Sequence, residues 1–123
     1  MVIDTSALIA IIFNEKKGPQ LVKILNEESG ALRMSTVNLA EVIVILRDRQ
    51  PQLAQELIDD VYGLGIRFVP PSVSQAETAA SARLKYPLNF GDCFTYALAK
   101  EEGVPILAID PDFKKTDVAT VMV

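Results

Sequence analysis

The chain has 123 residues, half of them hydrophobic, so residues 1–123 are expected to form a single domain with a sizeable core. It has no histidine and one cysteine, Cys93, which excludes histidine-based zinc sites, histidine triads, thiolate metal cages and an internal disulfide. The net charge of −4 argues against a broad basic nucleic-acid surface. No apolar stretch is long enough to span a membrane and Asp4 interrupts the apolar N-terminus, so we expect a cytoplasmic protein with no membrane segment or signal peptide.

Apolar runs separated by capping residues, prolines and glycines predict alternating strands and helices. In the first half of the chain we expect a strand at 1–3, helices at 7–13 and from 18–19 to 30, a weak strand at 31–34, and helices at 37–49 and 52–62. In the second half we expect a strand at 66–69, a helix from Ser72 or Ser74 to about 85, a loop at 86–89 and a helix at 91–102. A strand at 104–109, a loop forced by Pro111 and an edge strand at 118–123 complete the predicted elements. Nearly continuous apolar strands are typical of parallel sheets that are buried on both faces. The fold class predicted is therefore α/β, a three-layer α/β/α sandwich with a mainly parallel central sheet and right-handed crossovers.

Three aspartates lie at junctions where such a sheet would place a site. Asp4 and Asp110 each end an apolar strand, and Asp92 stands at the start of a helix. Ligands of open α/β sheets bind beyond the carboxyl ends of the strands, and a helix N-terminus favours a carboxylate or a phosphate. Each has a simpler reading, Asp4 and Asp92 as helix caps and Asp110 as a turn residue, but capping is compatible with function. Asp112 is a candidate outer ligand, ranked behind Asp110.

Glu41 is the most informative acid, because it interrupts the apolar stretch 37–46. A helix so apolar is expected to be largely buried, and a buried glutamate needs a partner or a metal. Asn38 lies three residues earlier on the same helix face and could contact substrate or a metal-bound water. The alternative is a narrow solvent-exposed stripe that Glu41 shares with Asn38, Asp48 and Arg49.

If the fold brings Asp4, Glu41, Asp92 and Asp110 together, a hard divalent cation, Mg²⁺ or Mn²⁺, would offset their repulsion. The result would be a metal-dependent phosphodiesterase. Ser6 could orient Asp4 or a metal-bound water. The candidate phosphate contacts are Arg47, Arg49, Arg83, Lys85, Lys114 and Lys115, with Lys114 and Lys115 ranked first because they follow Asp112 closely.

Four short motifs resemble those of PIN-domain proteins, in the same order and over nearly the whole chain. They are Val2-Ile3-Asp4-Thr5-Ser6-Ala7-Leu8, Asn38-Leu39-Ala40-Glu41-Val42, Gly91-Asp92-Cys93-Phe94-Thr95-Tyr96-Ala97-Leu98-Ala99 and Leu107-Ala108-Ile109-Asp110-Pro111-Asp112-Phe113. Singly they are weak, and together they are specific. The chain departs from the family pattern at Phe94 and Ile109, which could alter the shape of the pocket but remove no carboxylate.

The size of the chain looks most like the VapC-type toxins of toxin–antitoxin pairs. The resemblance implies a Mg²⁺- or Mn²⁺-dependent ribonuclease acting on structured RNA such as tRNA or rRNA, a toxin homodimer and a small antitoxin that blocks the site. The apolar helices within 37–62 are candidates for the dimer interface or the antitoxin groove.

Three rival interpretations remain. A haloacid dehalogenase-type phosphotransferase also begins with a strand ending in aspartate, but it requires a second aspartate where Ser6 stands. A PIN-like module could bind RNA or a protein without cleaving it. Lastly, the acids could be plain capping residues of an α/β domain.

Overall fold

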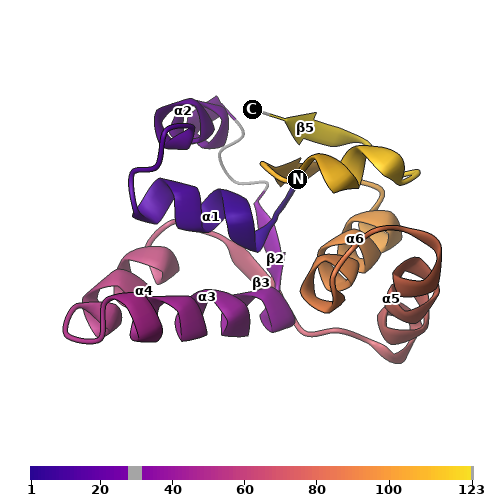
Figure 1. Cartoon of the computed structure of the whole chain (residues 1–123), viewed down its shortest axis with the longest axis horizontal. Helices are drawn as coiled ribbons and strands as arrows, with labels where there is room; N and C mark the ends of the chain where they lie inside the picture. The colour runs from indigo at the N-terminus through magenta and orange to yellow at the C-terminus, as the bar shows by residue number, and fades with distance from the viewer. Residues whose placement is uncertain (28–31, 123) are drawn as a thin grey trace.

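The computed structural model describes residues 1–27 and 32–122, which form a parallel five-stranded sheet with helices on both faces (Figure 1). The strands are β1 (Val2–Ile3), β2 (Arg33–Ser35), β3 (Arg67–Val69), β4 (Ile106–Ala108) and β5 (Thr120–Met122). The helices are α1 (Thr5–Ile12), α2 (Gly18–Glu27), α3 (Thr36–Arg49), α4 (Ala54–Tyr62), α5 (Val73–Lys85) and α6 (Phe90–Glu102), with a 3-10 helix η1 (Pro111–Lys115). The strand order is β3-β2-β1-β4-β5, so the first strand lies at the centre of the sheet.

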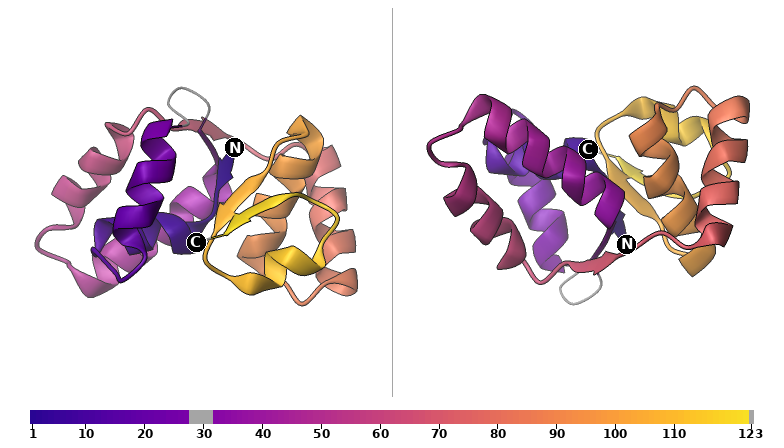
Figure 2. Two further views of the ribbon diagram at one scale, coloured as in Figure 1. Left: turned by 90° about the horizontal axis from the view of Figure 1, so that it is seen from above. Right: turned by 90° about the horizontal axis from the view of Figure 1, so that it is seen from below.

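Side chains of the central strands alternate between two separate hydrophobic clusters. Ile3 and Leu107 pack with α1, α2, α3 and α4, whereas Val2, Ile106 and Ala108 pack with α5 and α6 on the other face. All five side chains are fully buried. This is the period-two alternation of a strand buried on both sides. It confirms the predicted α/β/α sandwich, whose layers are visible from above and below in Figure 2.

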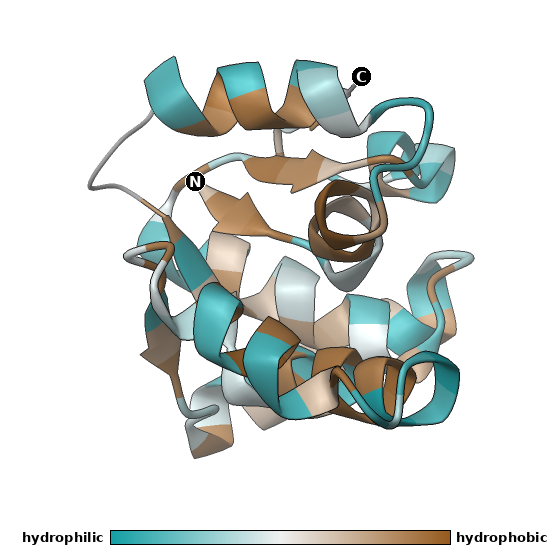
Figure 3. Ribbon diagram, turned by 90° about the vertical axis from the view of Figure 1, so that its left-hand side faces the viewer, coloured by the Kyte–Doolittle hydropathy of each residue, from teal (hydrophilic) through white to brown (hydrophobic). Residues whose placement is uncertain are grey.

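Hydropathy follows the same layering. In Figure 3 the strands of the central sheet are brown, and the outer helices alternate between brown and teal. The helices are therefore amphipathic covers over an apolar sheet. None of the helices within the described ranges is long and apolar enough to cross a bilayer.

Most predicted elements are confirmed, with shifted ends. The helix expected at 52–62 begins at Ala54, because residues 51–53 form a turn after Pro51. The strand expected at 104–109 is paired only over Ile106–Ala108, and residues 111–115 form a 3-10 helix where a loop was expected. The predicted ends at Gly30 and Val123, and the start of the second strand at Ala31, lie outside the described residues.

The expectation that the helix around Glu41 is largely buried is wrong. Only Asn38, Val42 and Leu46 of α3 are buried, and Val44 is 66% exposed. The apolar residues of this helix encircle it, but only one face packs against the core. Part of its hydrophobic surface is therefore available to a partner.

Candidate active site

Two strand ends and two helices meet at one cleft of about 390 Å³. Asp4 follows β1 and Asp110 follows β4, and these strands are direct neighbours in the sheet. The helices α3 and α6, which pack against each other, bring Glu41 and Asp92 to the same place. The cleft is lined by Asp4, Thr5, Ser6, Ile9, Glu15, Glu41, Ile45, Arg49, Asn89, Asp92, Ile109 and Asp110.

Asp4 is almost completely buried, with 1% of its surface exposed. Its Oδ2 accepts hydrogen bonds from the Ser6 hydroxyl at 2.7 Å and the Ser6 backbone N–H at 3.2 Å, so Asp4 itself caps α1. Its Oδ1 accepts a hydrogen bond at 3.0 Å from the hydroxyl of Thr95, which is fully buried in α6. Burial raises the pKa of Asp4, and the hydrogen bonds from Ser6 and Thr95 oppose that rise. Asp4 is thus held at both oxygens by hydroxyl groups.

Glu41 is fixed by a matching set of contacts. Its Oε1 accepts hydrogen bonds from the Thr5 hydroxyl and the Asn38 amide, each at 2.9 Å. The same Asn38 nitrogen donates to the Gly91 carbonyl oxygen at 2.9 Å, which joins α3 to the start of α6. A Cβ at Gly91 would overlap the Glu41 carboxylate, so only glycine leaves space for it. Asn38 therefore lies behind the cleft as a buried support of Glu41.

Asp92 is the third residue of a capping box at the start of α6. Asn89 is the N-cap: its side chain accepts from the Asp92 N–H at 2.8 Å, and Asp92 Oδ2 accepts from the Asn89 N–H at 3.2 Å. Asp92 is therefore not the N-cap of α6, because the cap lies three residues earlier, at Asn89. Burial, followed by the charge of Asp4 and smaller effects of Asp110 and Glu41, raises the pKa of Asp92 from 3.8 to about 7. The acids therefore act on one another electrostatically.

The fourth motif is divided between the cleft and the surface. Asp110 Oδ1 accepts from the Asp112 N–H at 2.9 Å, and Asp110 lines the cleft. Asp112 lies outside it and forms an ion pair with Lys115 at 3.2 Å. Lys114 is exposed on η1 and does not line the cleft either. The roles predicted for Asp112, Lys114 and Lys115 thus have no support in the geometry of the cleft.

Three contributors to the cleft were not singled out from the sequence. Thr95 holds Asp4, Thr5 holds Glu41, and Asn89 caps the helix of Asp92. Thr95 carried a usable signal, because a hydroxyl three residues after Asp92 points to the same side of the helix. The partners that Thr5 and Thr95 select lie 36 and 91 residues away, which no local pattern reveals.

The oxygen-rich lining suits a hard divalent cation, because carboxylates are the ligands such ions prefer. Yet no three acidic or cysteine side chains among the described residues are grouped closely enough to enclose a metal ion as they stand. Mg²⁺ commonly uses one or two carboxylates and keeps several waters. The lining therefore fits a cation held partly through water.

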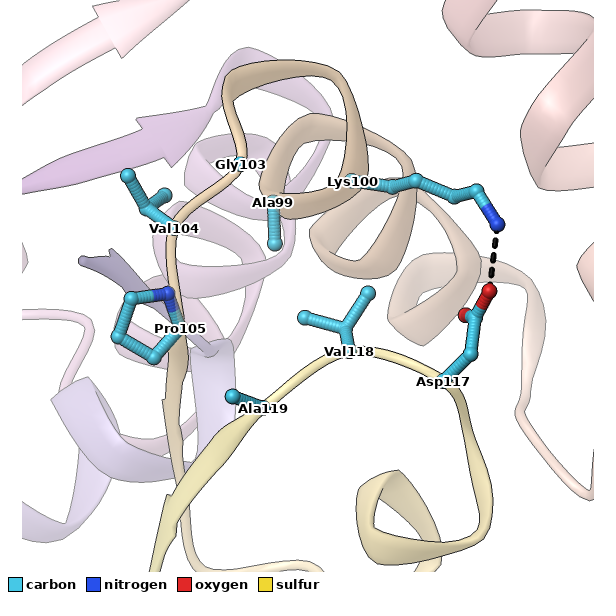
Figure 4. Close-up of a pocket in the computed structure, with 8 residues that line it drawn as sticks. All are labelled: Ala99, Lys100, Gly103, Val104, Pro105, Asp117, Val118 and Ala119. Atoms are coloured by element: carbon cyan, nitrogen blue, oxygen red, sulfur yellow. Dashed lines mark hydrogen bonds and ion pairs between the residues drawn. The ribbon is translucent and has the colours of Figure 1, made fainter.

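A second hollow of about 400 Å³ lies at the other end of α6 (Figure 4). It is lined mainly by small and apolar residues, including Ala99, Val104 and Val118. Its ion pair joins Lys100 to Asp117 at 2.6 Å, so these charges satisfy each other. The chemistry of the molecule is therefore concentrated at the acidic cleft.

A parallel sheet whose first and fourth strands end in aspartates, with two further acids on α3 and α6, defines the class of protein. A family model described as PIN domain matches residues 1–119, and the chain belongs to this family. Curated relatives include Ribonuclease VapC42 of Mycobacterium tuberculosis, 38% identical with 96% of each chain covered. Ribonuclease VapC of Mycolicibacterium smegmatis is 34% identical, with 98% of this chain and 99% of the relative covered.

Solved structures share the fold at lower identity. The crystal structure of Mycobacterium tuberculosis VapC20, described as a Sarcin-Ricin loop cleaving toxin, superposes with a TM-score of 0.83 at 17% identity, covering 98% of this chain and 97% of that one. The VapBC complex of Salmonella typhimurium bound to DNA gives 0.79 at 15% identity, covering 98% and 96%. At these identities the superpositions show the architecture alone.

Proposed function

We propose that the protein is a Mg²⁺- or Mn²⁺-dependent endoribonuclease and the toxin of a toxin–antitoxin pair, acting on tRNA or rRNA. The observation that carries the proposal is the convergence of Asp4, Glu41, Asp92 and Asp110 on one cleft. The family membership and the VapC ribonucleases among the relatives support it. Haloacid dehalogenase chemistry has no such support, because Ser6 occupies the position of its second aspartate and donates to Asp4.

The metal would be held by the four acids, directly by some and through water by others. Burial, and to a smaller extent the charges of the neighbouring acids, raises the pKa of both Asp4 and Asp92, so a bound cation would stabilise their ionised forms. When bound, a divalent cation supplies a water of lowered pKa and neutralises charge that develops on the phosphate.

The residues of the chain prepare the cleft for this chemistry. Ser6 and Thr95 fix the Asp4 carboxylate, while Thr5 and Asn38 fix that of Glu41. All four donors place their hydrogens on carboxylate oxygens, so the acids are oriented before a substrate arrives. Asp92 accepts the capping hydrogen bond at Oδ2, and the residue lines the cleft.

Exposed hydrophobic side chains support the proposed protein partners, a second copy of the chain and a small antitoxin. Val44 of α3, Val73 and Leu84 of α5 and Phe90 of α6 are 66%, 78%, 92% and 69% exposed. They lie on three helices, and each offers exposed hydrophobic surface that a partner would cover. A monomer at all concentrations in sedimentation would contradict the homodimer.

The test is cleavage of total cellular RNA by the purified protein with Mn²⁺ or with EDTA. Asp4→Asn should abolish cleavage, because one of the four proposed metal ligands loses its charge. The protein should stay folded, because asparagine can also cap α1 and the substitution removes a buried charge. Asp112→Asn is the matched control outside the cleft and should remain active, whereas Asp110→Asn should not. Excess Mn²⁺ should raise the melting temperature of the wild type more than that of Asp4→Asn.

Discrete products that require both metal and Asp4 would establish the nuclease, and mapping their ends would identify the RNA. A folded protein that binds RNA but cleaves none with any metal would instead be the non-cleaving PIN-like binding module. A melting temperature that Mn²⁺ leaves unchanged would contradict the metal site.

A further inference from the structure

The helices α1 and α3 run side by side along the cleft and meet at three levels. At the level of the acids, the Thr5 hydroxyl donates to Glu41 at 2.9 Å. One turn further along each helix, Ile9 and Ile45 both line the cleft. A further turn along, the Arg49 guanidinium carbon lies 5.5 Å from the centre of the Phe13 ring. The cleft thus has a direction, from a polar end through an apolar middle to a cationic end.

Of the described residues that line this cleft, Arg49 is the only lysine or arginine. It follows Glu41 by eight residues on a continuous helix, which places it about 12 Å further along the helix axis. It is exposed and makes no ion pair with the residues that the structure describes. Glu15 lines the same cleft and is not paired with it. The guanidinium is therefore held against a ring yet has its charge and donors available.

An acidic cleft in a chain of net charge −4 repels a polyanion such as RNA. A cationic side chain within the cleft therefore has a large effect on where the RNA backbone binds. The axial rise of about 12 Å between Glu41 and Arg49 is about two turns of α3, which separates a phosphate at Arg49 from one at the acids. We propose that Arg49 binds a phosphate that flanks the cleaved one and so sets the direction in which the RNA strand leaves the acids, along α3. This inference rests on the proposed nuclease function.

The other basic residues nearby do not offer this contact. Lys115 is paired with Asp112, and Lys114 lies outside the cleft on η1. Arg47 is exposed on the same helix as Arg49 but does not line the cleft. Arg47 is therefore a matched control of the same residue type, the same helix and the same net charge change.

The experiment measures binding of a short fluorescent single-stranded RNA to Asp4→Asn protein, which cannot cleave it, at fixed Mg²⁺ and roughly 50 to 200 mM KCl. Adding Arg49→Gln should weaken binding about three- to tenfold and reduce the slope of log affinity against log salt by about 0.7, the loss of one phosphate contact. Arg49→Lys should restore most of the slope, because it keeps the charge and loses only the planar fork. Arg47→Gln should leave the slope unchanged.

The inference would be overturned if Arg49→Gln and Arg47→Gln had the same salt dependence of RNA affinity. It would also be overturned if Arg49→Lys failed to restore the salt dependence that Arg49→Gln loses. The melting temperature of each variant separates a lost contact from a lost fold. If the wild type cleaves RNA and the two glutamine variants bind alike, the phosphate contact alone is wrong. If the wild type cleaves no RNA but the difference between the variants persists, the phosphate contact stands and the nuclease proposal fails.

Discussion

The substitution Asp92→Asn tests the electrostatic description of the cleft directly. Asn89 and Asp92 cap α6 reciprocally, and asparagine keeps an acceptor oxygen for the Asn89 N–H. The substitution therefore removes the charge and preserves the cap. In the metal-free protein the raised pKa of Asp92 means that the folded state disfavours the ionised form.

The pH dependence follows from that shift. Between the unfolded pKa of 3.8 and the folded pKa of about 7, the folded protein retains a proton that the unfolded chain has released. The stability of the metal-free wild type should therefore fall as the pH rises through this window and level off above 7. A shift of about three units corresponds to roughly 4 kcal/mol, and because the cleft is open to water and salt we expect on the order of 2 kcal/mol.

The assay is urea unfolding of wild type and Asp92→Asn in EDTA at several pH values from about 5.5 to 8. The variant should be more stable at the upper end, and its advantage should shrink toward the lower end. Saturating Mn²⁺ should reverse the order, because the wild type retains all four acids for the cation. Parallel pH profiles for the two proteins in EDTA would refute the claim that the folded protein disfavours the ionised form of Asp92.

Two further substitutions test how the acids are held. Gly91→Ala should displace the Glu41 carboxylate and abolish cleavage with little loss of stability, because the group that must move is the end of a flexible side chain. Gly63→Ala, whose Cβ would have an ordinary contact at 3.4 Å, should remain active. Equal cleavage by both variants would contradict the packing of Glu41 on Gly91. Thr95→Val keeps the shape of a fully buried side chain but removes its hydrogen bond to Asp4. We expect the free energy of unfolding to fall by about 1–2 kcal/mol and Mn²⁺ to bind more weakly in a thermal titration. Unchanged metal affinity would contradict the positioning role of Thr95.

The sequence predicted the layers because they depend on local signals, and the same signals singled out the four acids that line the cleft. Asp4 and Asp110 end apolar runs, and parallel strands bring such ends to one edge of a sheet. The same logic could not anticipate how Asp4 is held, because Thr95 reaches it from 91 residues away. The burial of α3 was overestimated for a related reason. Its residues are apolar all round, and only the tertiary arrangement decides which face is covered, so Val44 stays exposed.

Helix starts show the same division between local and long-range information. Of the two serines that the sequence offered for the start of α5, Ser72 is the cap. Asp4 caps α1 and Asn89 caps α6. At α1 the cap is itself one of the acids, and at α6 it exchanges hydrogen bonds with Asp92, which single-residue capping preferences do not encode.

The central position of β1 determines when the cleft can exist during synthesis. Asp4 is made long before β4, which begins at residue 106 and borders its strand on one side. At about 5–20 residues per second, a ribosome needs roughly 5 to 20 s between adding Asp4 and adding Asp110. Throughout that interval the nascent chain has an open sheet edge and lacks one acid of the four. The complete set of carboxylates therefore comes together only after Asp110 has been added.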